Sequence, residues 1–175
     1  MRFFYRITGS LSEGSPARDR RSADPRRARI ECEMLEGRAL MSNIPGVSLM
    51  FGNIAITAPK ASGNIAQVSI APDHNVLVSL NGQSEEFSPS KVYNVTYKGG
   101  LGGYDTFTNS TSLVELVYVY GDHNIINGGT SYNYVYFKGN NNMFIGQNGS
   151  INDVFGYNTT DTIGDPPNTL IQVYH

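Results

Sequence analysis

The side chains that most often carry out catalysis are few in this chain of 175 residues. Its three histidines, His74, His123 and His175, lie far apart, and none has the short spacing to a cysteine, glutamate or second histidine that metal sites use. The chain lacks the Gly-x-Ser-x-Gly sequence of a nucleophile elbow and the Gly-x4-Gly-Lys-Ser/Thr sequence of a phosphate-binding loop. The adjacent acids Glu85 and Glu86 fall in a predicted strand, where neighbours face opposite sides and make a poor acid–base pair. We therefore predict that the protein is not an enzyme.

Glycine and apolar residues recur with a fixed period in the second half of the chain. The glycine series are Gly103, Gly121, Gly139 and Gly128, Gly146, Gly164; the apolar series are Val119, Phe137, Phe155 and Phe107, Ile125, Met143. All four series share one 18-residue step, and such a period indicates a solenoid in which each coil buries its inward face only against its neighbours. The sequence therefore predicts an all-β fold built on a short parallel β-roll, or β-solenoid, with 18-residue coils.

Composition divides the chain into three segments. Residues 1–46 carry nine arginines against six acids and little apolar sequence, which predicts a basic, disordered leader. Residues 47–98 contain short β-branched runs with Asn81-Gly82 between two of them, the strongest local signal for a tight hairpin. We predict that 47–98 form a hairpin-rich cap and that 99–175 form the solenoid. No apolar run approaches the about 18 residues that a membrane span requires.

Residues 29–42 resemble a short N-terminal element, roughly R-x3-E-x-L-E-x-R-x-L-x-S, that precedes many surface and secreted proteins of planctomycete-type bacteria. The matching residues are Arg29, Glu33, Leu35, Glu36, Arg38, Leu40 and Ser42, whereas Met41 replaces the expected leucine. The resemblance implies an exported bacterial protein, located outside the cell or in the cell envelope. An arginine-rich leader could also contact nucleic acid or anionic lipid, but here the arginines alternate with acids and no aromatic stacking platform accompanies them.

The first glycine-rich corner, residues 99–108, resembles the nonapeptide repeat of RTX-type (haemolysin-type calcium-binding) β-rolls, Gly-Gly-x-Gly-x-Asp-x-U-x, where U is a large apolar residue. Gly100, Gly103, Asp105 and Phe107 match, and Leu101 stands where a glycine is expected. The resemblance implies a Ca²⁺ site in which Gly100 and Gly103 supply carbonyl oxygens and Asp105 supplies a carboxylate. Calcium takes about six to eight such oxygen ligands.

The later corners depart from that calcium pattern. Aligned on the 18-residue period, the position of Asp105 is taken by His123, Asn141 and Thr159, and Asp122 lies one residue out of register. Because the number of anionic ligands sets calcium affinity, we expect corners held by asparagine and threonine hydrogen bonds, with no cofactor. Calcium binding at the first corner is the alternative.

These observations predict a non-enzymatic exported protein with a structural or adhesive role at the cell envelope or in the extracellular matrix. The tyrosines of the predicted strand 113–120 are either covered or form an aromatic outer surface for a polysaccharide or another envelope component. We expect no nucleic-acid partner, and the oligomeric state is left open. Two alternatives are a calcium-binding RTX-like module that folds on export, and a polysaccharide-active β-solenoid enzyme, which would need a column of carboxylates.

Overall fold

The computed structural model describes residues 40–164, 166–167 and 169–174. The chain separates into two units, Met1–Glu36 and Gly37–His175, and the strands described below all belong to the second. The predicted leader up to residue 39, most of the element at 29–42, and His175 lie outside the described residues.

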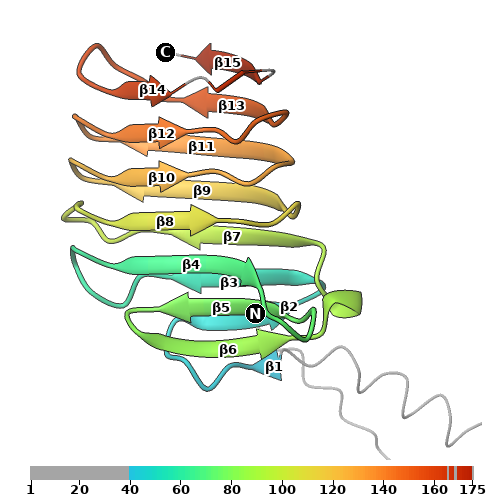
Figure 1. Cartoon of the computed structure of the whole chain (residues 1–175). Helices are drawn as coiled ribbons and strands as arrows, with labels where there is room; N and C mark the ends of the chain where they lie inside the picture. Colours follow the sequence, from blue (N-terminus) through green and yellow to red (C-terminus); the bar gives the residue numbers. More distant parts are fainter. Residues whose placement is uncertain (1–39, 165, 168, 175) are drawn as a thin grey trace, which may run out of the picture. The chain divides into compact units, whose positions relative to one another are not determined.

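The second unit is built from two β-sheets that face each other (Figure 1). The eight-stranded sheet has the order β1 (Leu40–Met41), β2 (Val47–Met50), β3 (Asn53–Thr57), β7 (Asn94–Lys98), β9 (Val114–Tyr120), β11 (Tyr132–Lys138), β13 (Ile151–Phe155) and β15 (Leu170–Tyr174). The seven-stranded sheet has the order β14 (Thr162–Gly164), β12 (Met143–Ile145), β10 (Ile125–Asn127), β8 (Thr106–Asn109), β4 (Ile65–Ile70), β5 (Val76–Leu80) and β6 (Gln83–Phe87). A short 3-10 helix, η1 (Pro89–Lys91), precedes β7.

From β7 onward the chain alternates between the two sheets, and each strand pairs in parallel with the strand one coil earlier. The pairs β8–β9, β10–β11, β12–β13 and β14–β15 make four coils, which Figure 1 shows stacked along one axis. The predicted fold class, an all-β chain with a short parallel β-solenoid, is confirmed.

The coils are not uniform in length. Thr106 pairs with Ile125, Ile125 with Met143, and Met143 with Thr162, so the first and third steps are one residue longer than the second. Because a slip of one residue turns a side chain to the opposite face, the apolar series predicted from a strict period mixes two faces. Phe107 therefore aligns with Ile126 and Phe144 inside the core, and not with Ile125 and Met143.

The core lies between the sheets, and one continuous inward-facing row from each sheet runs through it. One row contains Ile56, Tyr97, Val117, Val135 and Val154, and the other contains Ala66, Phe107, Ile126 and Phe144. The Tyr97 and Phe107 rings stack across the core with centroids 4.8 Å apart. The Tyr97 hydroxyl is buried without a hydrogen-bond partner among the described residues. Burial, followed by the negative charge of Asp105, raises the pKa of Tyr97.

The segment 47–98 contributes both hairpins and the start of the parallel stack. The predicted hairpin at Asn81-Gly82 joins the antiparallel strands β5 and β6, and both turn residues have the positive φ (51° and 85°) that such a turn needs. However, β3 pairs in parallel with β7, and β4 with β8. The parallel stack thus begins before residue 99. The insertion of β5 and β6 makes this first step, from Asn53 to Asn94, more than twice as long as the later ones and hides it from a search for a short period.

Candidate functional site

The corner between β7 and β8 brings together the three residues predicted to bind calcium. The Gly100 N–H donates to Asp105 Oδ2 at 2.6 Å, and Gly103, at φ +75°, follows the turn at residues 101–102 and lies two residues before Asp105. A Cβ at Gly103 would lie 2.1 Å from the Asp122 carbonyl oxygen of the next coil. These contacts require glycine, because the backbones of neighbouring coils approach each other directly here.

Asp105 is completely buried, and N–H groups occupy both of its oxygens. Its Oδ1 accepts hydrogen bonds from the Asn64 backbone N–H at 2.7 Å and from Asn64 Nδ2 at 2.8 Å, while Oδ2 accepts from Gly100. A calcium ion would have to displace these donors and replace them with oxygens. These hydrogen bonds disfavour the calcium site predicted at Gly100, Gly103 and Asp105, because they occupy the one carboxylate it would use.

Asp105 belongs to a ladder of buried side chains with one member in each coil. Its members are Asn64, Asp105, Asn124, Asn142 and Asp161. The backbone N–H of each member donates to the side-chain Oδ1 of the next, at distances of 2.7, 3.0, 3.0 and 2.8 Å. Each bond satisfies a backbone donor at the point where the chain leaves one sheet for the other and has no strand partner.

The residues that align with Asp105 are therefore Asn124, Asn142 and Asp161, and not His123, Asn141 and Thr159. The extra residue in the coil between β8 and β10 causes the shift of one, and a second extra residue between β12 and β14 makes the shift two at Asp161. His123 instead stacks on Tyr104 outside the corner, with ring centroids 4.9 Å apart. Tyr104, His123 and Asn141 all take positive φ, between 57° and 59°, so these corners use a left-handed residue that is not glycine.

A second buried polar ladder lies at the start of the long strands, where Glu115 aligns with Asn133 and Asn152. Glu115 Oε2 accepts from Asn109 Nδ2 at 2.8 Å and from the Gly129 N–H at 3.2 Å, whereas Oε1 has no partner among the described residues. Burial, only partly offset by these two hydrogen bonds, raises the pKa of Glu115 to about 8. At pH 7 Glu115 therefore holds its proton to a far greater extent than an exposed glutamate does. In the sequence, its place among inward-facing valines was the signal of this burial.

The outer face of the eight-stranded sheet carries a row of stacked aromatic rings. Tyr118, Tyr136, Phe155 and Tyr174 follow each other on β9, β11, β13 and β15, with centroids 4.9, 4.5 and 4.6 Å apart. Tyr118 and Tyr136 pair directly, as do Tyr136 and Phe155. The predicted series Val119, Phe137, Phe155 breaks here, because Phe155 aligns with Tyr136 on the outer face while Phe137 is buried.

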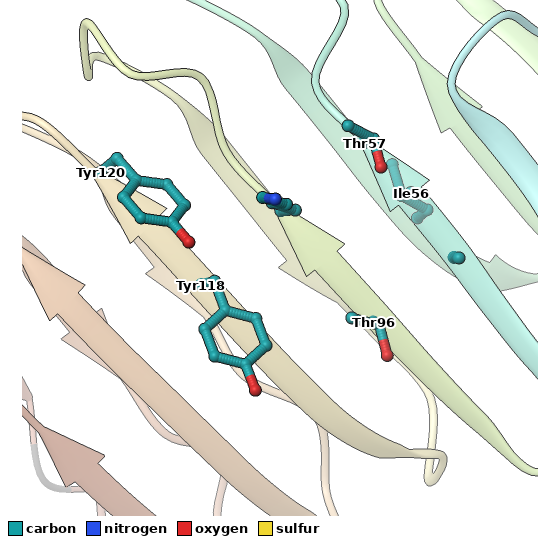
Figure 2. Close-up of a pocket in the computed structure, with 7 residues that line it drawn as sticks. Ile56, Thr57, Thr96, Tyr118 and Tyr120 are labelled. Atoms are coloured by element: carbon teal, nitrogen blue, oxygen red, sulfur yellow. The ribbon is translucent and has the colours of Figure 1, made fainter. Parts of the chain in front are cut away.

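A shallow groove lies at the β9 end of this row. It has a volume of about 280 Å³ and is lined by Ala55 and Thr57 of β3, Thr96 and Lys98 of β7, and Tyr118 and Tyr120 of β9. Figure 2 shows the two tyrosine rings side by side on β9, with Thr96 and Thr57 on the neighbouring strands. The sequence offered no signal of this groove, because its residues meet only through the parallel pairing of strands separated by the β5–β6 insertion.

The other residues considered for chemistry lie apart. His74 is an exposed turn residue with φ 69°, and Glu85 and Glu86 pair with the adjacent residues Val78 and Leu77 of β5. Glu85 accepts hydrogen bonds from Ser42 and Asn43, and Glu86 from Asn75. Across residues 40–164, 166–167 and 169–174, no three histidine, cysteine or acidic side chains gather as a metal site would require. Within those same ranges, no helix is long and apolar enough to cross a membrane.

The corner ladder predicts a large effect of Asn124→Ala. The change removes the acceptor of the Asp105 N–H and the donor to Asn142, so the free energy of unfolding should fall by about 2–3 kcal/mol. Asn127→Ala is the matched control, since Asn127 is half-buried and its side chain makes one hydrogen bond, to Thr108. Its cost should stay below about 1 kcal/mol. Urea unfolding of the full chain, followed by far-UV circular dichroism, measures both; equal losses would contradict the ladder's role.

The raised pKa of Glu115 predicts that stability falls as pH rises. The folded state holds a proton up to about pH 8 that the unfolded chain, with a pKa near 4.5, has already released. The contribution is therefore complete below pH 4.5 and is lost on passing through pH 8, by on the order of 3–5 kcal/mol. Glu115→Gln, which cannot ionise, should be less sensitive to pH and more stable than the unmodified protein at pH 9. Glu86→Gln is the exposed control. Parallel stability–pH curves for Glu115→Gln and the unmodified protein would refute the assignment.

The N–H groups that occupy both oxygens of Asp105 predict that folding does not depend on calcium. Thermal melting of the full chain should give the same β spectrum and melting temperature with excess chelator and with millimolar Ca²⁺. A specifically bound ion at 100 times its dissociation constant would instead add about 2.7 kcal/mol of stability. A coil spectrum in chelator that becomes β only with calcium would restore the RTX-like alternative. Asp105→Asn, measured in the same way, would then show whether this corner holds the ion.

Comparison with known proteins identified no relative of this chain. No family model, curated protein or solved structure matches the chain. Three local features remain as the basis for a function: a buried ladder of hydrogen-bonded asparagines and aspartates, a row of aromatic rings on one outer face, and a groove at the end of that row.

Proposed function

We propose that this chain is a non-enzymatic exported protein with a structural or adhesive role at the cell envelope or in the extracellular matrix. The observation that carries the proposal is the ordered outer face of the eight-stranded sheet. There Tyr118, Tyr136, Phe155 and Tyr174 form a continuous stack across four strands. A flat aromatic face that is repeated at each coil suits attachment to an extended partner.

Further apolar side chains on the same face support adhesion. Tyr132 on β11 is 46% exposed and Leu170 on β15 is 54% exposed, and both align with Ile151 on β13. Side chains of this size, aligned over successive strands, form the kind of surface that marks interaction sites. The rows are held in place by a backbone that is hydrogen-bonded from coil to coil, so a partner would meet a preorganised surface.

The buried carboxylates favour a structural role over the two alternatives. Asp105 is engaged by three N–H groups, which leaves no oxygen directed at a cation. Glu115 of β9 is directed into the core, whereas Asp153 of β13 is directed outward on the other side of the same sheet. These two acids therefore do not face a common substrate. The resemblance of residues 29–42 to the planctomycete-type element supports export.

Two measurements on the full chain test the proposal: its location in the cell and its binding to isolated envelopes. Expressed with its leader in a planctomycete-type bacterium, an epitope-tagged chain should be found in the envelope or medium and be accessible to protease on intact cells. The purified chain should sediment with isolated envelopes, and Tyr136→Thr should reduce the bound fraction by roughly 5- to 10-fold, since it interrupts the aromatic row.

Met143→Thr is the matched control, because Met143 lies half-buried on β12 of the other sheet and the same β-branched residue is introduced. It should leave envelope binding unchanged, and melting curves should show that both variants are folded. Retention of the full chain in the cytoplasm, or equal envelope binding by Tyr136→Thr and the unmodified chain, would refute the proposal.

A further inference from the structure

The groove at the β9 end of the aromatic row has the chemistry of a binding site for a polar ring. Its volume of about 280 Å³ is close to the lower end of the ~300–1,000 Å³ usual for ligand sites. Its lining includes two tyrosines of β9, whose rings Figure 2 shows beside Thr96 and Thr57 of the neighbouring strands. Lys98 of β7 also lines the groove. Such a combination of aromatic surface with a few placed polar groups is typical of ligand pockets.

Tyr118 is the ring whose face is directed to this groove. Within the row, each ring stacks face to face on its neighbour, so the inner members present mainly their edges to solvent. Tyr118 stacks on Tyr136 at one face, and in the direction of β7 its aligned neighbour is Lys98, which is not aromatic. The second face of Tyr118 is therefore available on the groove side, as a platform for the C–H groups of a ligand.

The groove also carries positive charge. Lys98 is exposed within it, and Lys138 of β11 aligns with Tyr120 on the other side of β9. The outward-facing positions of β3, β7 and β9 contain no aspartate or glutamate, since Glu115 of β9 is directed inward. This local excess of lysine lies on a chain whose formal net charge is −2, so it would attract an anion to this place.

We propose that the groove binds an acidic saccharide, a sugar ring carrying a carboxylate such as a uronic acid unit of an extracellular polysaccharide. The C–H face of the ring packs on Tyr118, and its carboxylate pairs with Lys98. Its hydroxyls hydrogen-bond to Thr57, Thr96 and Tyr120. Thr96 can accept such a bond because its own hydroxyl proton is donated to Asn53. The inference names the ligand of the adhesive face and so rests on the proposed function.

The test titrates the full chain with uronate oligosaccharides (oligogalacturonate and oligomannuronate) against neutral dextran oligomers, by calorimetry at low and at physiological salt. We expect at least one uronate to bind, with affinity that falls as salt rises, and at least 10-fold weaker binding of the neutral sugar. Tyr118→Ala and Lys98→Ala should each weaken uronate binding 10-fold or more, and Lys98→Ala should also remove most of the salt dependence.

Two controls separate the groove from general effects. Tyr174→Ala removes a ring from the far end of the same row, and Lys91→Ala, in η1, makes the same change in net charge outside the groove. Both should bind uronate as the unmodified chain does. Absence of uronate binding would overturn the inference, as would losses in the controls equal to those of Tyr118→Ala and Lys98→Ala in folded protein. Equal competition by polyphosphate, single-stranded DNA or anionic lipid vesicles would also overturn it, by showing a general polyanion surface.

This experiment can fail without the proposed function failing. If envelope binding depends on Tyr136 while no uronate binds, the aromatic row is adhesive through another partner and only the saccharide assignment falls. If uronate binds at Tyr118 while the chain remains in the cytoplasm, the site stands and the envelope role falls. The two experiments use different variants and different readouts, so each outcome is assigned to one proposal.

Discussion

The structure depends on a single repeated hydrogen bond, from the backbone N–H of one buried corner residue to the side-chain oxygen of the corner residue in the next coil. At this corner the chain passes between sheets, and the N–H has no strand to pair with, so the side chain supplies the missing acceptor. The same bond fixes which residue stands opposite which. Because register decides the face of every side chain, it also determines the buried rows of the core and the aromatic row outside.

Both polar ladders supply hydrogen-bond acceptors to buried N–H groups, but their carboxyl groups differ in environment. The corner ladder places Asp105 and Asp161 among asparagines and surrounds each carboxylate with N–H groups, Asp161 receiving those of Asn142 and Asn158. The ladder on the long strands contains one acid, Glu115, which has an oxygen without a partner among the described residues and a raised pKa. An amide would suit that position, as Asn133 and Asn152 do in the following coils.

The fold class could be predicted from the sequence, because glycine spacing and apolar alternation are local features that repeat along the chain. The corner ladder could be predicted from the sequence only in part. The asparagine content indicated hydrogen-bonded corners, but the strict 18-residue alignment placed His123 opposite Asp105, where the structure has Asn124. One added residue in a coil is invisible to a period search when glycines near the insertion keep the shorter step, as Gly103 and Gly121 do. The groove could not be predicted, since Thr57, Lys98 and Tyr118 come together only after the stacking order of β3, β7 and β9 is known.

The direction of the corner ladder has a consequence for how the chain acquires its structure during synthesis. Every bond in it runs from an earlier coil to a later one, so a newly made coil exposes an unsatisfied N–H until the following coil docks. The hairpins β2–β3 and β4–β5–β6 can close from local sequence and offer the first edge. This direction favours growth by one coil at a time from the N-terminal end, which is the order in which the ribosome delivers the coils.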